Sequence, residues 1–237
     1  MHILKNTSHE EARDVMPNMQ RRNFLKYLGI GSALVTAGSI ASSCHKDHDN
    51  NPNKGVNLGT GDVAVLNYAY ALEQLEAAFY TQVVLTPYNG MSPTELTFFT
   101  DIRNHELGHR DFFKTALGAN AIPGLAVNFS SIDFTSRTSV LNTAKAFEDL
   151  GVSAYNGAAQ YISSTTSGIA YLGLAGKIVS VEARHAAYIR DLVTPGSFAG
   201  SDVIDTNGLD TTRTPAQVYA IAKTYITTQI DTSTLPH

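Results

Sequence analysis

Apolar residues recur every three or four positions over four long stretches of the chain, which is the spacing of one face of an α-helix. The first stretch shows the pattern clearly, because Leu66, Ala69, Tyr80 and Val83 fall on one stripe together with two glutamates. The four stretches cover residues 62–84, 93–117, 139–162 and 169–192. They predict four helices and an all-α fold.

Turn signals between these stretches predict how the helices connect. Ser92 and Glu95 form a capping-box pattern around Pro93, which marks the start of the second helix. Short connections join the first helix to the second and the third to the fourth, whereas residues 118–137 form a long irregular segment. We therefore expect an antiparallel four-helix bundle in which this long loop crosses between two helical hairpins. An extra C-terminal helix over residues 215–230 is expected to pack on the outside.

One pattern of two helices occurs twice along the chain, which makes it an internal repeat. In each copy, a glutamate on one helix is followed 33 or 34 residues later by the glutamate of a Glu-x-x-His motif on the next helix. Residues three positions apart share a helix face, so each motif points its carboxylate and its imidazole the same way. The matched positions are Glu73, Glu106 and His109 in the first copy and Glu148, Glu182 and His185 in the second.

Four carboxylates in one bundle core are electrostatically costly unless cations neutralise them. They repel one another and lose hydration, and both effects raise their pKa values. Two divalent cations carry four positive charges, and the two imidazoles complete a set of oxygen and nitrogen ligands. Such ligands suit iron and manganese, and they do not exclude zinc. The six repeated residues therefore predict a site for two metal ions, Fe or Mn.

The repeat also sorts the other polar residues near these positions. Glu76 lies one turn after Glu73, but its counterpart in the second copy is Gly151, so the repeat favours Glu73 as the ligand. His105 is adjacent to a motif glutamate but aligns with Val181. We therefore expect His105 to lie outside the ligand set, either as a neighbour of the ligands or in the core.

Two tyrosines occupy matching positions of the repeat, seven residues after Glu73 and seven residues after Glu148. Tyr80 and Tyr155 lie two turns from the glutamate of their own helix, which is too far for a hydrogen bond with it. Each hydroxyl is placed to hydrogen-bond a metal ligand on another helix. The alternative is that both rings simply fill the core.

The charge of the chain excludes one class of function. Counted from residue 44 onward, the net charge is −6, and no basic stripe occurs in this part of the sequence. Nucleic-acid binding requires clustered Lys and Arg side chains, so no nucleic-acid partner is expected.

Residues 1–43 have the layout of a twin-arginine signal peptide, with Arg21-Arg22 ahead of a moderately apolar run of about 17 residues. A run of this length is marginal for a membrane-spanning helix, so a short uncleaved anchor is the alternative. Cys44, the only cysteine, stands where a bacterial lipoprotein signal places its lipidated residue, and polar residues 44–59 indicate a flexible tether. We expect twin-arginine export to the periplasm or cell envelope and attachment to a membrane through lipid on Cys44.

The repeated segments resemble the ferritin-like superfamily. The segments that carry the resemblance are LEQLEAAFY, NHELGHRDFF, AFEDLGVSAYNGAA and SVEARHAAYIRDL. The chain is similar, more closely, to exported ferritin-like proteins that include the desiccation-related proteins of plants and bacteria. This resemblance implies a ferritin-like domain over residues 60–237 that holds two Fe or Mn ions.

The predicted pair of metal ions favours reaction with oxygen or hydrogen peroxide, because two adjacent metal ions can bind and polarise a small oxygen species between them. The expected setting is oxidative or desiccation stress. Two alternatives stay open: a non-catalytic metal-binding or stress-protective module, and iron storage in a cage, which a lipidated tether disfavours. The sequence does not decide between Fe and Mn, and it does not decide the oligomeric state.

Overall fold

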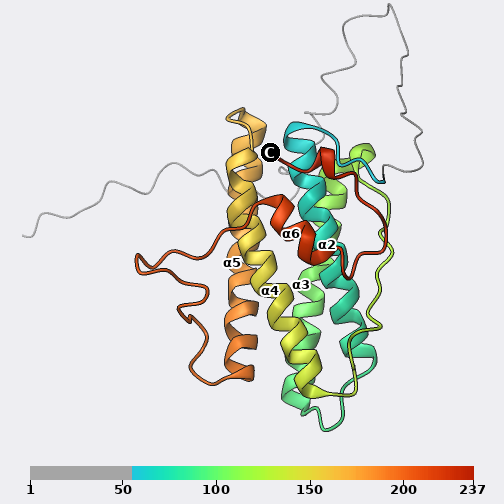
Figure 1. Cartoon of the computed structure of the whole chain (residues 1–237), viewed down its shortest axis with the longest axis vertical. Coiled ribbons are helices and arrows are strands. Elements are labelled where there is room, and N and C mark those ends of the chain that lie inside the picture. The colour runs from blue at the N-terminus through green and yellow to red at the C-terminus, as the bar shows by residue number, and fades with distance from the viewer. Residues whose placement is uncertain (1–54) are drawn as a thin grey trace, which may run out of the picture. The chain divides into compact units, whose positions relative to one another are not determined.

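The computed structural model describes residues 55–237, which form a bundle of four long helices (Figure 1). The helices are α2 (Gly61–Leu85), α3 (Pro93–Leu117), α4 (Arg137–Ala158) and α5 (Thr166–Val193). The all-α fold expected from the sequence is therefore confirmed. The predicted signal peptide, Cys44 and the tether up to residue 54 lie outside the described residues. Among the described residues, none of the helices has the length and apolarity needed to span a membrane.

The helices pack as two antiparallel hairpins, α2 with α3 and α4 with α5. The segment between α3 and α4 runs the length of the bundle, so that α4 begins at the end where α3 began (Figure 1). This path is the crossing between hairpins that was predicted for residues 118–137. The loop also contributes to the core, because Phe129 and Phe134 each place their rings 5.9 Å from the fully buried ring of Phe79.

The start of α3 follows from local sequence chemistry. The Ser92 hydroxyl accepts a hydrogen bond from the Glu95 backbone N–H at 3.1 Å, and the Glu95 carboxylate accepts one from the Ser92 N–H at 3.2 Å. Pro93 occupies the first turn, where its missing N–H has no cost. The capping box predicted from the sequence is therefore confirmed, and it fixes the register of the helix that carries Glu106 and His109.

The C-terminal helix is shorter than the sequence pattern predicts. Helix α6 spans Pro215–Ala222, rather than residues 215–230. Beyond it the backbone pairs with other segments, since the N–H of Thr227 donates to the carbonyl of Ala126 at 2.9 Å and Ile226 forms a bridge with Val127. These tertiary hydrogen bonds replace the helical ones, and β-branched residues favour the extended backbone that makes them.

The last five residues of the predicted tether belong to the folded domain instead. The N–H of Val56 donates to the carbonyl of Gln229 at 2.7 Å, and the N–H of Asp231 donates back to the carbonyl of Val56 at 2.9 Å. Leu58 is 1% exposed and joins the core. Residues 55–59 contain only two apolar side chains, Val56 and Leu58. Their mostly polar and glycine composition therefore predicted a tether rather than a packed segment.

Candidate metal centre

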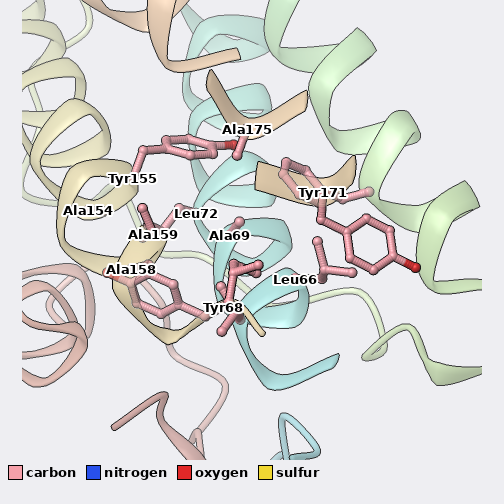
Figure 2. Close-up of a pocket in the computed structure, with 13 residues that line it drawn as sticks. Leu66, Tyr68, Ala69, Leu72, Ala154, Tyr155, Ala158, Ala159, Tyr171 and Ala175 are labelled. Carbon is pink, nitrogen blue, oxygen red and sulfur yellow. The ribbon is translucent and has the colours of Figure 1, made fainter. Parts of the chain in front are cut away.

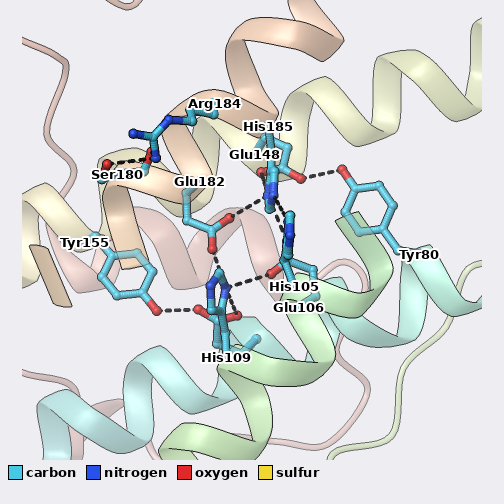
Figure 3. Close-up of polar contacts among 11 residues, drawn as sticks. Tyr80, His105, Glu106, His109, Glu148, Tyr155, Ser180, Glu182, Arg184 and His185 are labelled. Carbon is cyan, nitrogen blue, oxygen red and sulfur yellow. Dashed lines mark hydrogen bonds and ion pairs between the residues drawn. The ribbon is translucent and has the colours of Figure 1, made fainter. Parts of the chain in front are cut away.

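The six repeated glutamate and histidine side chains converge in the middle of the bundle (Figure 3). Each hairpin supplies one glutamate from its first helix and a glutamate and a histidine from its second. The four glutamates are completely buried. By helix, the residues are Glu73 on α2, Glu106 and His109 on α3, Glu148 on α4, and Glu182 and His185 on α5.

The six side chains form two overlapping groups, each with a geometry that could hold a metal ion. In each group, one atom from each of four residues lies within 4.8 Å of the others. Glu106 and Glu182 belong to both groups, so the two positions share two carboxylates. The first group adds Glu73 and His109, and the second adds Glu148 and His185.

Each imidazole turns its Nδ1 atom towards three carboxylates. Nδ1 of His109 lies 2.7 Å from Glu182 Oε1, and it lies 3.4 Å from an oxygen of Glu106 and 3.5 Å from an oxygen of Glu73. The arrangement repeats on the other side. Nδ1 of His185 lies 3.0 Å from Glu106 Oε1, 3.4 Å from Glu182 Oε2 and 3.5 Å from Glu148 Oε2. The sequence repeat is therefore also a repeat of geometry.

The two repeated tyrosines connect the halves of the bundle. Tyr80, on α2, donates its hydroxyl hydrogen to Glu148 Oε1 at 2.5 Å. Tyr155, on α4, donates in the same way to Glu73 Oε1. Tyr80 of the first repeat therefore holds Glu148 of the second, and Tyr155 of the second repeat holds Glu73 of the first. Each hydroxyl thus hydrogen-bonds a candidate metal ligand on another helix.

Burial and mutual charge shift the pKa values of the centre in opposite directions. Burial raises the pKa of Glu148 to about 8 and that of Glu73 well above its usual range. Burial also acts on Glu182, but the ion-pair contacts with both histidines outweigh it and lower the pKa of Glu182 to about 2.

Both imidazoles are held in the charged form when no metal ion is bound. Burial lowers the pKa of His109 and of His185, but the surrounding carboxylates outweigh burial and raise the pKa of each histidine to about 12. The two imidazolium groups are then the only cations facing these carboxylates in the part of the chain that the structure describes. They take the place of the positive charge that metal ions would bring.

Several side-chain atoms that face into the centre lack hydrogen bonds. These atoms show whether the residues present fit metal ions. Among the described residues, one oxygen each of Glu73, Glu106 and Glu148, both oxygens of Glu182 and Nδ1 of His185 are buried without a hydrogen-bond partner. Leaving a buried polar atom unsatisfied costs about 1–3 kcal/mol. A cation bound between these atoms would remove that cost, so the residues present fit two metal ions. Which of the six bind metal stays a prediction.

Glu76 is a fifth carboxylate near the centre, and it belongs to neither group. It is 4% exposed, and burial together with the nearby glutamates raises its pKa well above the usual range. Its carboxylate lies against Gly151, where an added Cβ would stand 3.0 Å from Glu76 Oε1. Gly151 therefore makes room for Glu76, which explains why these two residues occupy matching positions of the repeat.

His105 lies outside the two groups but touches one of their members. It is exposed on α3, and its Nδ1 atom lies 2.8 Å from Nε2 of His185 (Figure 3). The sequence placed His105 outside the ligand set, but it could not identify the partner because His185 is on a different helix.

An apolar pocket lies between the helices, and Figure 2 shows the side chains that line it. Its walls are alanine, aliphatic and aromatic side chains. Tyr155 is part of this wall, and its hydroxyl bonds Glu73. The lining contains no charged side chain, so the pocket adds no metal ligand.

A comparison with protein families identifies the domain. The family model of the ferritin-like domain matches residues 61–195, more than half of the chain. The chain belongs to the ferritin-like domain family. The match begins at the first residue of α2 and ends two residues beyond α5, so this ferritin-like domain contains all six residues of the centre. A search of curated proteins found no match.

Proposed function

We propose that this ferritin-like protein is exported and binds two metal ions, Fe or Mn, that react with oxygen or hydrogen peroxide during oxidative or desiccation stress. The observation that carries the proposal is the pair of overlapping groups that share Glu106 and Glu182. Glu73 and His109 would complete one position, and Glu148 and His185 would complete the other. Four carboxylates match the charge of two divalent ions, and oxygen and nitrogen ligands suit Fe and Mn.

The side chains around the centre support chemistry on a small molecule. When bound, two neighbouring metal ions supply a pair of Lewis acids that orients and polarises such a species. Tyr80 and Tyr155 hold Glu148 and Glu73 in place. The side chain of His109 is 14% exposed, whereas the four glutamates are fully buried. This limited solvent exposure of the centre favours a substrate of the size of O2 or H2O2.

Metal analysis of the purified full chain tests the proposal directly. We expect two Fe or Mn ions per chain, and consumption of oxygen or peroxide by the loaded protein. Two bound ions without consumption of either would support the alternative of a non-catalytic metal-binding module. Many ions per chain would support storage. Absence of metal after supplementation with Fe and Mn would refute the metal-binding proposal and leave only a protective role without metal.

We also propose that the protein leaves the cytoplasm by the twin-arginine route and is anchored by lipid on Cys44. The support is the Arg21-Arg22 pair, the run that follows it and the position of the only cysteine. Export in the folded state would allow metal ions to be bound before transport, which suits a site assembled from four helices.

Two variants test this proposal for location. Replacing both Arg21 and Arg22 with Lys should retain precursor in the cytoplasm, as seen by cell fractionation. Cys44→Ala should release the exported protein from the membrane, since stable anchoring needs lipid chains. Cys44→Ala protein that stays tightly bound to membranes would instead indicate an uncleaved N-terminal anchor.

A further inference from the structure

The two histidines of the centre differ on the side that faces away from the glutamates. Nε2 of His185 lies 2.8 Å from Nδ1 of His105, and the two rings are parallel to within 5°. Among residues 55–237, the corresponding Nε2 of His109 has no hydrogen-bond partner. The side chain of His109 is also more exposed, at 14% against 6% for His185.

The internal repeat explains why only one histidine has such a partner. His105 immediately precedes the motif glutamate of α3, and the residue at the matching position of α5 is Val181. An imidazole can accept a hydrogen bond, whereas a valine side chain cannot. The first copy of the repeat therefore supplies a hydrogen-bond partner, His105, for His185 of the second copy. The second copy has Val181 at the matching position and supplies no such partner for His109.

The contact with His105 determines which nitrogen of His185 faces the carboxylates. A histidine binds a metal ion through a nitrogen with a free lone pair, and Nδ1 is the atom of His185 that points into the centre. In the neutral ring the hydrogen is then on Nε2, which donates to Nδ1 of His105. The hydrogen bond thus selects the required tautomer and fixes the orientation of the ring.

We propose that His105 is a positioning residue that makes the two metal positions unequal. The position of Glu148 and His185 binds its ion more tightly and fills first, whereas the position of Glu73 and His109 exchanges its ion more readily. The inference rests on the proposed function, because it needs two bound ions. Loss of an outer partner of a metal-binding histidine typically weakens metal binding about 10–100-fold, which sets the expected difference.

Titration of the metal-free full chain with Mn²⁺, followed by calorimetry and by the electron paramagnetic resonance of free Mn²⁺, measures both affinities. In the native protein we expect two steps separated by about 10–100-fold. His105→Val should weaken the tighter step and bring the two affinities together. His105→Gln, whose amide oxygen can accept the same hydrogen bond, should restore much of the difference.

Val181→His is the matched gain-of-function variant. It places an imidazole at the mirrored position of the repeat, and we expect it to strengthen the weaker step while leaving the tighter one unchanged. His105 is exposed and Val181 is half-buried, so both positions should accept these changes without loss of the fold. Thermal unfolding of each metal-free variant provides the control.

The outcomes separate this inference from the proposed function. Native protein that binds no Mn²⁺, and no Fe in the metal analysis, would contradict both. Two bound ions whose affinities stay within about threefold of the native values in His105→Val would overturn this inference alone. Equal weakening of both steps, together with a lower melting temperature, would show that His105 acts on the fold rather than on one position, and would also overturn it.

Discussion

Glu182→Gln should abolish binding of both metal ions, whereas Glu73→Gln should weaken only one position. Glu182 belongs to both groups of the centre, and Glu73 belongs to one. The amide keeps the size of the side chain but removes its negative charge, and hard divalent cations bind a neutral amide much less strongly. Elemental analysis of the purified variants should therefore show close to zero ions per chain for Glu182→Gln and about one for Glu73→Gln.

Glu76→Gln is the matched control for these two variants. Glu76 is on the same helix as Glu73 and is similarly buried, but it belongs to neither group. We expect Glu76→Gln to keep two ions per chain. Equal loss of metal in Glu76→Gln and Glu73→Gln would show that the alignment of the repeat selected the wrong carboxylate of α2.

Glu182→Gln and Glu76→Gln should have opposite effects on the stability of the metal-free protein. Glu182 is the carboxylate that both imidazolium groups stabilise, and they lower its pKa to about 2. Glu182→Gln should therefore destabilise the metal-free fold, because it leaves two buried cations with less negative charge around them. Burial and the neighbouring glutamates raise the pKa of Glu76, so Glu76→Gln should be neutral or stabilising at neutral pH.

The helices and the centre follow from the sequence because their signals are local or repeated. Ser92, Pro93 and Glu95 lie within four residues and determine the start of α3 by themselves. The centre is assembled from four distant helices, but each half is encoded by the same pattern. The alignment of Glu73 with Glu148 therefore carried long-range information that single motifs lack.

Features that depend on one unrepeated contact could not be derived from the sequence. The hydrogen bond between His105 and His185 joins residues 80 positions apart, and no pattern marks it. The end of α6 depends on backbone pairing of Thr227 with the crossing loop, which overrides the apolar spacing that predicted a longer helix. Leu58 is buried by the same C-terminal region, so the start of the domain depends on a contact with the end of the chain.

The metal-free protein should become more stable as the pH falls from about 9 to about 5. The folded-state pKa of Glu148 is about 8, against about 4.3 in an unfolded chain. Between these values the folded protein binds a proton that the unfolded chain does not bind, so lowering the pH favours folding. Each such proton contributes about 1.4 kcal/mol per pH unit to the free energy of unfolding. Burial shifts the pKa values of Glu73 and Glu76 in the same direction.

The histidines reinforce this trend, and Glu182 limits it. The pKa values of His109 and His185 are about 12 in the fold and about 6.5 in the unfolded chain. Their contribution is complete below pH 6.5 and is lost as the pH rises towards 12. Glu182, with a pKa of about 2, contributes stability that is lost as the pH falls below about 4.5. Stability without metal should therefore be greatest between about pH 4.5 and 6.5.

Bound metal ions should reverse this pH dependence. Metal ions compete with protons for the same carboxylates and imidazoles, so their affinity falls as the pH is lowered. At a concentration of 100 times the dissociation constant, each ion adds about 2.7 kcal/mol to the free energy of unfolding. Chemical denaturation from pH 5 to pH 8.5, with Mn²⁺ or with chelator, measures both curves. The metal-loaded protein should gain stability as the pH rises and the chelated protein should lose it.

Glu76→Gln separates the effect of the ligands from that of burial alone. The variant should flatten the pH dependence of the chelated protein, because it removes one carboxyl with a raised pKa, and it should leave the added stability from Mn²⁺ unchanged. Chelated native protein that loses stability from pH 8 to pH 6 would show that the buried carboxylates are ionised in the fold at no cost. The four glutamates would then not need the positive charge that two metal ions bring.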